Sequence, residues 1–230
     1  MEAHYSVAID GPSGAGKSTI ARAVSKRFGF LYVDTGAIYR TVGLAVDRCG
    51  FFPGDEASVQ SLLPKLDIEL GYDANGVQVE LLNDEDVSGL IRTPEISKRA
   101  SEVSAMPSVR AFLLGMQRSL AGRHSVVMDG RDIGTVVLPN ADLKVFLTAD
   151  SRKRAERRWK ELVEAGREIS LDEVQKDIDE RDERDSCRDA APLRKADDAV
   201  EIDTSSLNLS ESIDAVCSLI SERLGVAAHG

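Results

Sequence analysis

The chain has 230 residues, of which 42% are hydrophobic, and it carries a formal net charge of −10. This size and apolar content allow one compact α/β body with small insertions, or two modest domains, and they argue against global disorder. The acidic balance disfavours binding to nucleic acid or to an anionic membrane, so an anionic substrate has to be attracted by local positive charge.

The cysteines and the N-terminal residues indicate a compartment. Cys49, Cys187 and Cys217 are scattered, odd in number and without metal-ligand spacing, which indicates a reducing environment and no disulfide framework. The run MEAHYSVAID has no basic stretch followed by an apolar one, and no window approaches the roughly 18 apolar residues of a membrane span. We therefore expect a cytoplasmic protein with no membrane partner.

The first elements along the chain form a recognisable order. Residues 6–9 (SVAI) predict a short buried strand, and the loop GPSGAGKST follows it. Ile20, Val24 and Phe28 recur at helical spacing and predict an amphipathic helix that ends near Gly29. Residues 30–33 (FLYV) predict a second strand. Strand, glycine loop, helix and strand in this order begin a parallel α/β sheet.

The glycine loop fits the pattern G-x-x-x-x-G-K-[ST] of a phosphate-binding loop. Its backbone N–H groups, aided by the N-terminus of the following helix, suit the β-phosphate of a nucleoside triphosphate. Lys17 would bridge the β- and γ-phosphates, and the Ser18 hydroxyl suits Mg²⁺. The residues assigned to ATP are Gly11, Pro12, Ser13, Gly14, Ala15, Gly16, Lys17, Ser18 and Thr19.

Residues 66–82 alternate between apolar and polar in a pattern that differs from the rest of the chain. Leu66, Ile68 and Leu70 would lie on one face of a strand, and Val77, Val79 and Leu81 on one face of the next. Asn75-Gly76 between them is a strong hairpin signal. An antiparallel hairpin within a parallel fold predicts an inserted subdomain.

The second half of the chain continues the α/β rhythm. Further strands are predicted at 125–128, 143–147 and 199–202, and a final helix at 208–224 with a capping box at Asn208 and Glu211. The segment 150–190 is rich in charge and poor in aromatic residues, and it predicts two solvated helices joined near Gly166. We expect this segment to move as a lid.

The phosphate loop does not tell where the phosphoryl group goes. Three classes of protein remain possible: a GTPase switch, a motor ATPase and a small-molecule kinase. The absence of N-K-x-D argues against the first, and a motor needs a longer chain.

The run MDGRDIGTVV (128–137) places Arg131 between Asp129 and Asp132 after a predicted buried strand. Such charges are costly to bury without partners, so they indicate either a ligand site or an Asp–Arg–Asp network that caps the strand.

Two further segments carry candidate acceptor residues. Thr35, Tyr39 and Arg40 follow the second strand and would lie at the carboxyl edge of the sheet. In ERDERDSCRDAAPL (180–193), Arg181, Asp185 and Arg188 have the spacing of one helix face. A salt-bridged surface helix explains the same spacing. Taken with Arg152, Arg154, Arg157 and Arg158, however, the arginines suit phosphoryl transfer, where cations follow the charge from donor to acceptor.

The motifs GPSGAGKST, DTGAIYR, DVSGLIRT, DGRDIGTVV and ERDERDSCRDAAPL, in this order, resemble the bacterial-type cytidylate kinase (CMP kinase) family of P-loop nucleoside monophosphate kinases. The resemblance implies an α/β fold: a P-loop kinase core with a parallel sheet flanked by helices, an NMP-binding insert containing the hairpin, and a helical lid. It divides the chain into core (1–37), NMP-binding region (38–104), core (105–149), lid (150–190) and C-terminal core (191–230).

The resemblance also implies roles for individual residues. The ribose would be contacted by Thr35, Arg181 and Asp185, and the CMP phosphate by Arg40, Arg131 and Arg188. Cytosine would be read by Ser101, Arg110 and Asp132, with Tyr39 also assigned to the CMP site. The lid would bring Arg154, Arg157 and Arg158 to the ATP phosphates. The catalytic set is Lys17, Arg131, Arg188 and Arg158, and the metal set is Ser18 with Asp129, the latter through water.

The implied reaction is Mg²⁺-dependent transfer of the γ-phosphoryl group of ATP to CMP or dCMP by a monomer. Asp132 can then accept from the cytosine amino group, the acidic pairing known for cytosine N4. A P-loop kinase for UMP, AMP or a non-nucleotide alcohol is the nearest alternative, and a nucleotide-dependent switch without catalysis is a more distant one.

Overall fold

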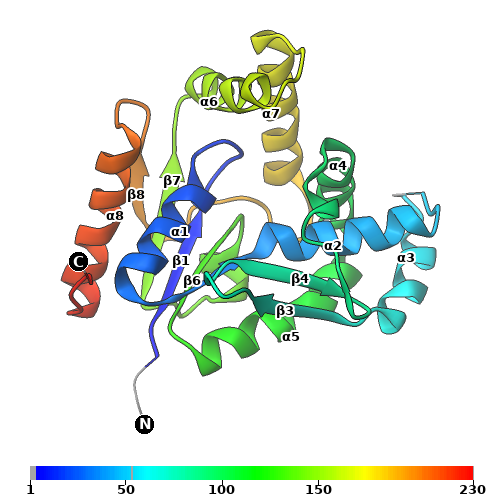
Figure 1. The fold of residues 1–230 in the computed structure, drawn as a ribbon, viewed down its shortest axis with the longest axis horizontal. Coiled ribbons are helices and arrows are strands. Elements are labelled where there is room, and N and C mark those ends of the chain that lie inside the picture. Colours follow the sequence, from blue (N-terminus) through cyan, green and yellow to red (C-terminus); the bar gives the residue numbers. More distant parts are fainter. Residues whose placement is uncertain (1–3, 53, 230) are drawn as a thin grey trace. The chain divides into compact units, whose positions relative to one another are not determined.

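The computed structural model describes residues 4–52 and 54–229. The chain forms two compact units, shown in Figure 1. One, here called the core unit, runs as far as Tyr32 and resumes at Ala121. The other, here called the insert unit, is Val33–Leu120. The finer division into five parts, with its boundaries at 37, 104, 149 and 190, remains a prediction. No helix in the described ranges is long and apolar enough to cross a membrane.

A five-stranded sheet in the order β2-β6-β1-β7-β8 organises the core unit. The pairs β1–β6, β1–β7 and β7–β8 are parallel, as the sequence predicts. The strands are β1 Ser6–Asp10, β2 Leu31–Asp34, β6 Val126–Gly130, β7 Leu143–Thr148 and β8 Val200–Asp203. Because β1 is central, the loop that follows it opens in the middle of the carboxyl edge, where sheets of this type bind ligands.

Two helices cover one face of this sheet, α1 Lys17–Phe28 and α8 Leu209–Leu224. Ile20 and Val24 of α1 pack with Val216 and Ile220 of α8 in the main apolar core. Each such side chain contributes about 1.5–3 kcal/mol when fully buried. The predicted helix stop at Gly29 and the predicted capping box at the start of α8 are both confirmed.

The helices α6 Ser151–Glu164 and α7 Leu171–Cys187 form a hairpin joined through Gly166, as predicted. Their contact is a small apolar cluster of its own, centred on Ala155, Val174 and Ile178 with Trp159 packed against it. The segment therefore contains more core-forming residues than its high charge density suggests. Because this cluster is separate from the main core, opening the hairpin exposes little apolar surface.

The insert unit contains the helices α2 Thr35–Arg48, α3 Glu56–Leu62, α4 Pro94–Val103 and α5 Pro107–Arg123, the last of which extends past Leu120. Short 3₁₀ turns lie at Leu63–Lys65 and Leu90–Arg92. The predicted hairpin is confirmed as β3 Ile68–Tyr72 and β4 Gln78–Leu82, with Glu85–Asp86 (β5) as a third antiparallel strand. α2 packs against α4 and β4.

The buried face of β4 is the opposite of the one that the apolar pattern predicts. Gln78, Glu80 and Leu82 are buried, whereas Val77 is 44% exposed. The turn supplies part of the reason, because Asp73 accepts from the backbone N–H of Val77 at 2.8 Å and sets the register. A one-residue change of register exchanges the two faces of a strand. Gln78 and the Oε1 of Glu80 have hydrogen-bond partners that the sequence pattern does not reveal, whereas the buried Oε2 of Glu80 has none among the described residues.

Candidate active site

The glycine loop joins the central strand β1 to α1 in the conformation that its motif predicts. Gly11 has φ +149°, and a Cβ there would lie 1.9 Å from the backbone oxygen of Leu147, so only glycine fits. The N-terminus of α1 then begins at Lys17 without a side-chain cap. Its free N–H groups and its dipole make this end a ready anion site.

Lys17 is buried at the start of α1, and its Nζ donates to the backbone oxygen of Pro12 at 2.7 Å. Burial lowers the pKa of this amine well below its usual value, and the positive charge of Arg131 lowers it further. Asp129 and Asp10 act in the opposite direction. The ammonium form of this amine gains much from an anionic ligand, because a phosphate would stabilise the charge that has lost its hydration through burial.

Ser18 and Asp129 meet at the end of β6. The Ser18 hydroxyl donates to Asp129 Oδ2 at 2.7 Å, and the Tyr32 hydroxyl donates to Oδ1 at 2.9 Å. The carboxylate is therefore oriented by one hydroxyl on each oxygen. Two adjacent oxygen donors beside the phosphate loop suit a hard cation such as Mg²⁺, which prefers oxygen ligands and a substrate phosphate. The residues present thus fit the metal that the motif predicts.

The DGRD segment is held by a carboxylate from the neighbouring strand. Immediately after Asp132, residues Ile133–Val137 form a single π-helical turn, an uncommon geometry that is frequent at functional sites. Asp10, at the end of β1, accepts from the backbone N–H groups of Ile133 at 2.8 Å and Gly134 at 2.7 Å. Burial raises the pKa of Asp10 to about 6, although these two hydrogen bonds lower it. One carboxylate thus ties the strand before the phosphate loop to the start of this turn.

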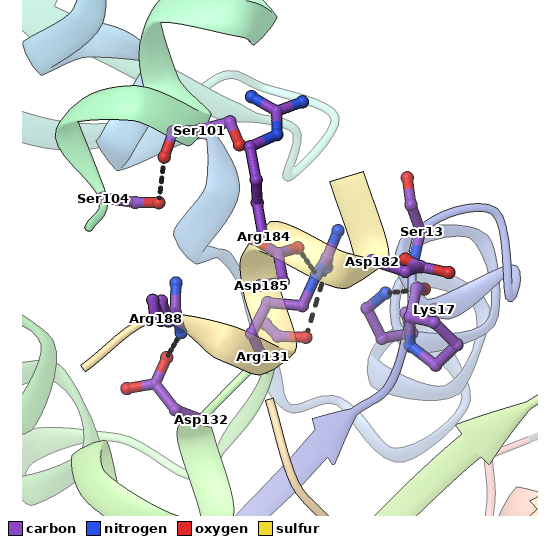
Figure 2. Close-up of polar contacts among 12 residues, drawn as sticks. Ser13, Lys17, Ser101, Ser104, Arg131, Asp132, Asp182, Arg184, Asp185 and Arg188 are labelled. Carbon is purple, nitrogen blue, oxygen red and sulfur yellow. Dashed lines mark hydrogen bonds and ion pairs between the residues drawn. The ribbon is translucent and has the colours of Figure 1, made fainter. Parts of the chain in front are cut away.

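Two arginine–aspartate pairs lie beyond the strand end (Figure 2). Arg131 Nε donates to Asp185 Oδ2 at 2.8 Å, and Arg188 Nη2 donates to Asp132 Oδ1 at 3.3 Å. Burial alone would raise the pKa of Asp185, but the charges of Arg131 and Arg181 outweigh it and hold the pKa below its usual value. The structure thus brings together Arg131, Asp132, Arg181, Asp185 and Arg188, as the motifs predict.

The predicted helix face that combines Arg181, Asp185 and Arg188 is wrong in one member. α7 ends at Cys187, and Arg188 has the extended backbone angles φ −66° and ψ 141°. Its Nε donates to the backbone oxygen of Ala191 at 2.7 Å, which turns the guanidinium toward Asp132. The prediction from spacing fails at Arg188 because helical spacing places residues on one face only while the backbone stays helical, and the backbone is extended at Arg188.

Asp182 connects α7 to the phosphate loop. Its Oδ1 accepts from the backbone N–H of Ser13 at 2.9 Å, and its other oxygen is ion-paired with Arg154. Arg154 is buried, and it also donates to the backbone oxygens of Ser13 at 2.8 Å and Ala149 at 2.9 Å. Arg154 thus contacts the backbone of the phosphate loop, and its assignment to the ATP phosphates remains a prediction.

The other two arginines of α6 have different surroundings. Arg157 donates to the backbone oxygen of Thr204 at 2.6 Å and to its hydroxyl at 3.1 Å. Arg158 is half exposed and pairs with Glu161 on the same helix. Among the described residues these contacts do not include the phosphate loop, so the assignment of both arginines to the ATP phosphates remains a prediction that depends on movement of the helix.

The insert unit holds the remaining predicted residues. Arg40 Nη2 donates to Asp34 Oδ2 at 3.0 Å, and Thr35 is buried in the first turn of α2. The guanidinium of Arg110 lies 5.5 Å from the ring centroid of Tyr39 and donates to the backbone oxygen of Ser104 at 3.0 Å. The buried Oγ of Ser101 has no hydrogen-bond partner among the described residues, while its backbone oxygen accepts from Ser104 (Figure 2).

Sequence reasoning did not single out Asp10, Tyr32, Gln78, Glu80 or Asp182. A signal was present for some of them. Asp10 is a charged residue at the end of an apolar strand, and Gln78 and Glu80 are polar residues two apart in a predicted strand. Such residues require partners when buried. Their partners lie 44 or more positions away for Asp10 and Gln78, so only the folded chain identifies them.

Known proteins with related sequences match nearly the whole chain. A family model described as Cytidylate kinase matches residues 7–222. The cytidylate kinase of Geobacter sulfurreducens is 48% identical over 217 residues, which is 94% of this chain and 93% of that protein. That of Desulfitobacterium hafniense is 46% identical over 224 residues, 97% of this chain and 96% of that protein.

A solved structure supports the fold alone. An uncharacterized protein from Eubacterium ventriosum has a TM-score of 0.53 at 12% identity, covering 96% of this chain and 100% of its own. The names of the sequence relatives agree with the features of the site, which are a phosphate loop and two arginine–aspartate pairs. The chain belongs to the cytidylate kinase family.

Proposed function

We propose that this chain is a (d)CMP kinase, which transfers the γ-phosphoryl group of ATP to CMP or dCMP and releases ADP and CDP or dCDP. The observation that carries the proposal is the pair of arginines, Arg131 and Arg188, held by Asp185 and Asp132 beyond the end of β6. Two guanidinium groups in one small region suit an acceptor that is itself a phosphate. Membership of the cytidylate kinase family identifies the acceptor nucleotide as CMP.

On the donor side, Lys17 neutralises the β- and γ-phosphates of ATP. The backbone of residues 11–16 and the N-terminus of α1 bind the β-phosphate. Because Lys17 is buried, its charge is poorly screened and acts strongly on a phosphate that replaces the Pro12 contact. Arg154 holds the loop backbone from α6, and closure of the lid brings Arg157 and Arg158 to the phosphates and excludes water.

On the acceptor side, Arg131, Arg188 and Arg40 bind the CMP phosphate. Asp185 orients Arg131 and, with Arg181 and Thr35, contacts the ribose. This arrangement places positive charge where the transferred group leaves the donor and joins the acceptor, which lowers the barrier through electrostatic stabilisation. Arg158 and Arg188 stabilise the negative charge of the phosphoryl group during its transfer from ATP to CMP.

Cytosine is read by Asp132, Ser101 and Arg110, with Tyr39 supporting Arg110 through its ring. The buried Oγ of Ser101 lacks a partner in the described chain, and a hydrogen bond from a base edge would satisfy it. Asp132 accepts from the cytosine amino group, whereas uracil presents a carbonyl at the same position. The site therefore favours CMP over UMP.

The cofactor of this reaction is Mg²⁺, held by Ser18 and, through water, by Asp129. When bound, the ion would neutralise part of the charge on the triphosphate. Tyr32 and Ser18 orient the Asp129 carboxylate. We further propose a cytoplasmic monomer that acts on small-molecule substrates, with no nucleic-acid or membrane partner. The acidic net charge of −10 supports the last point.

A coupled ADP-release assay tests the function. Purified protein with Mg-ATP is supplied with CMP, dCMP, UMP, AMP or no acceptor. We expect rapid ADP release with CMP and dCMP, much slower release with UMP and AMP, and almost none without acceptor. Preference for UMP or AMP would reassign the acceptor, and ADP release that is independent of any acceptor would overturn the kinase assignment.

A further inference from the structure

The hairpin of the insert unit carries two buried polar side chains that the proposed mechanism does not use. Gln78 is 4% exposed and Glu80 is fully buried, although both lie on a strand with apolar neighbours. A buried carboxylate and a buried amide are costly unless they are paired, and replacing both by apolar residues is often tolerated. Their partners therefore indicate what they hold.

Gln78 binds both backbone groups of Asp34, the last residue of β2. Its Oε1 accepts from the Asp34 N–H at 2.8 Å, and its Nε2 donates to the Asp34 backbone oxygen at 3.3 Å. The side-chain amide thus takes the position of a neighbouring strand at the end of β2. Since both backbone groups are held, the direction of the Asp34 side chain is held as well.

Asp34 in turn controls Arg40. Its Oδ1 caps α2 by accepting from the Ala37 N–H at 2.8 Å, and its Oδ2 accepts from Arg40 Nη2 at 3.0 Å. The Nε of Arg40 is buried and has no partner among the described residues. A Cβ at Gly36 would lie 3.2 Å from both Arg40 Nη1 and Asp34 Oδ1, so the guanidinium lies close over the first turn of the helix. Arg40 is thus held by Asp34 through Nη2, while its Nε keeps a hydrogen-bond donor that is unused among the described residues.

Glu80 determines which way the Gln78 amide faces. Its Oε1 accepts from Gln78 Nε2 at 2.8 Å. Because Glu80 Oε1 accepts this bond, the amide turns its nitrogen toward Glu80 and its oxygen toward the Asp34 N–H. The backbone of Glu80 is itself held, because its N–H donates to Ser88 Oγ at 2.9 Å and its carbonyl accepts from the Val87 N–H at 2.9 Å.

We infer that Gln78 is a positioning residue for the acceptor phosphate, acting through Asp34 on Arg40, and that Glu80 fixes the orientation of its amide. This inference rests on the proposed function, in which Arg40 binds the CMP phosphate. All five residues of this relay, Asp34, Gly36, Arg40, Gln78 and Glu80, lie in the insert unit. The hairpin then serves acceptor binding without contacting the nucleotide itself.

The test uses Gln78→Met, which keeps the length of the side chain and removes its hydrogen bonds, and Glu80→Leu. We expect the KM for CMP to rise about tenfold in each, since a lost hydrogen bond has about this effect, while the KM for ATP and the kcat change little. Glu80→Gln restores an acceptor for Gln78 and should recover much of the loss. Glu69→Gln, at an exposed position of the same hairpin, is the matched control.

A double-mutant cycle separates positioning from general loosening of the fold. In an Arg40→Met background, Gln78→Met should raise the KM for CMP no further, because the path through Arg40 is already broken. A full additional tenfold effect there, or an unchanged KM for CMP in soluble Gln78→Met and Glu80→Leu proteins, would overturn the inference while the proposed function stands. Wild-type protein without CMP-dependent ADP release would overturn both.

Should Gln78→Met fail to fold, Glu80→Gln and Gln78→Glu provide the same comparison. Gln78→Glu keeps the shape and places a second carboxylate against Glu80 and the Asp34 backbone oxygen, so like charges oppose each other. We expect its KM for CMP to exceed that of Glu80→Gln by at least a few fold. Equal KM values for Gln78→Glu, Glu80→Gln and the wild type would rule out the relay.

Discussion

Ser18 donates its hydroxyl hydrogen to Asp129 at 2.7 Å, and this single bond joins the start of α1 to the end of β6. The two residues are 111 positions apart in the chain. Ser18 lies in the first turn of the helix that follows the glycine loop, and Asp129 lies near the end of a buried strand. Their contact brings the donor loop and the DGRD segment to one place.

Asp129→Asn should raise the Mg²⁺ concentration for half-maximal activity about tenfold or more. The amide keeps the shape but loses the charge that attracts a cation, and a hydrogen bond or contact to a charged group is worth about 1.5–3 kcal/mol. The measurement is rate against free Mg²⁺ at fixed ATP and CMP. Asp197→Asn, at an exposed position, is the control. An unchanged Mg²⁺ requirement in a folded variant would place the ion elsewhere.

Lys17→Ala should reduce kcat on the order of 10²-fold or more while leaving the fold intact. Removing a buried cation from the transferring phosphate costs a few kcal/mol in the barrier. The variant protein should melt near the wild-type temperature, since among the described residues the lysine side chain makes one hydrogen bond, to the backbone oxygen of Pro12. Lys26→Ala, at the exposed end of α1, is the matched control. Near-normal turnover in a folded Lys17→Ala protein would contradict the kinase assignment.

Asp132→Asn should lower kcat/KM for CMP and narrow the CMP-over-UMP ratio about tenfold or more. The amide can donate to the uracil carbonyl, whereas the carboxylate repels it, and each factor of ten corresponds to about 1.4 kcal/mol. Both acceptors are compared at saturating Mg-ATP, with Asp189→Asn as the exposed control. If the ratio stays at its wild-type value while both rates fall, Asp132 acts on Arg188 and not on the base.

Asp10 should leave a signature in the pH dependence of stability. Its pKa is raised from 3.8 to about 6 in the folded protein by burial. Between these values the native state binds the proton more tightly than the unfolded chain, so this group's contribution is present at low pH and is lost as pH rises through about 6. The groups that act on it are the N–H groups of Ile133 and Gly134, the Asp132 carboxylate and the Lys17 amine.

The test compares wild type with Asp10→Asn, which cannot titrate, by urea unfolding from pH 4 to 7. The free energy of unfolding of the wild type minus that of the variant should fall as the pH rises. Since one pKa unit corresponds to about 1.4 kcal/mol, the total change should be on the order of 3 kcal/mol. A constant difference would show that the pKa of Asp10 is not shifted by folding, and a difference that grows with pH would show that it is lowered.

The hairpin of α6 and α7 should become protected from hydrogen exchange when both nucleotides bind. Its apolar cluster is small and separate from the main core, so local opening costs little in the free protein. Helix α8, which packs into the main core, serves as the internal reference. Equal exchange in α6 and α7 with and without both nucleotides would contradict a moving lid.

The sequence alone determined the features that depend on neighbouring residues. The phosphate loop, the helix stop at Gly29, the capping box at Asn208 and the hairpin at Asn75-Gly76 are all local in the chain, and each was found where it was predicted. Backbone preference and short-range hydrogen bonds decide such features before any packing. The order of five motifs also sufficed to indicate the family.

Only the tertiary structure decided which charges meet. The spacing of Arg188 predicted a helix face, but its partner is Asp132, 56 positions away, because the helix ends at Cys187. The apolar pattern of β4 predicted the wrong buried face, because Gln78 binds the end of a strand 44 positions away. The position of a buried polar group depends on its hydrogen-bond partner. When that partner is distant in sequence, the local apolar and polar pattern carries no sign of it.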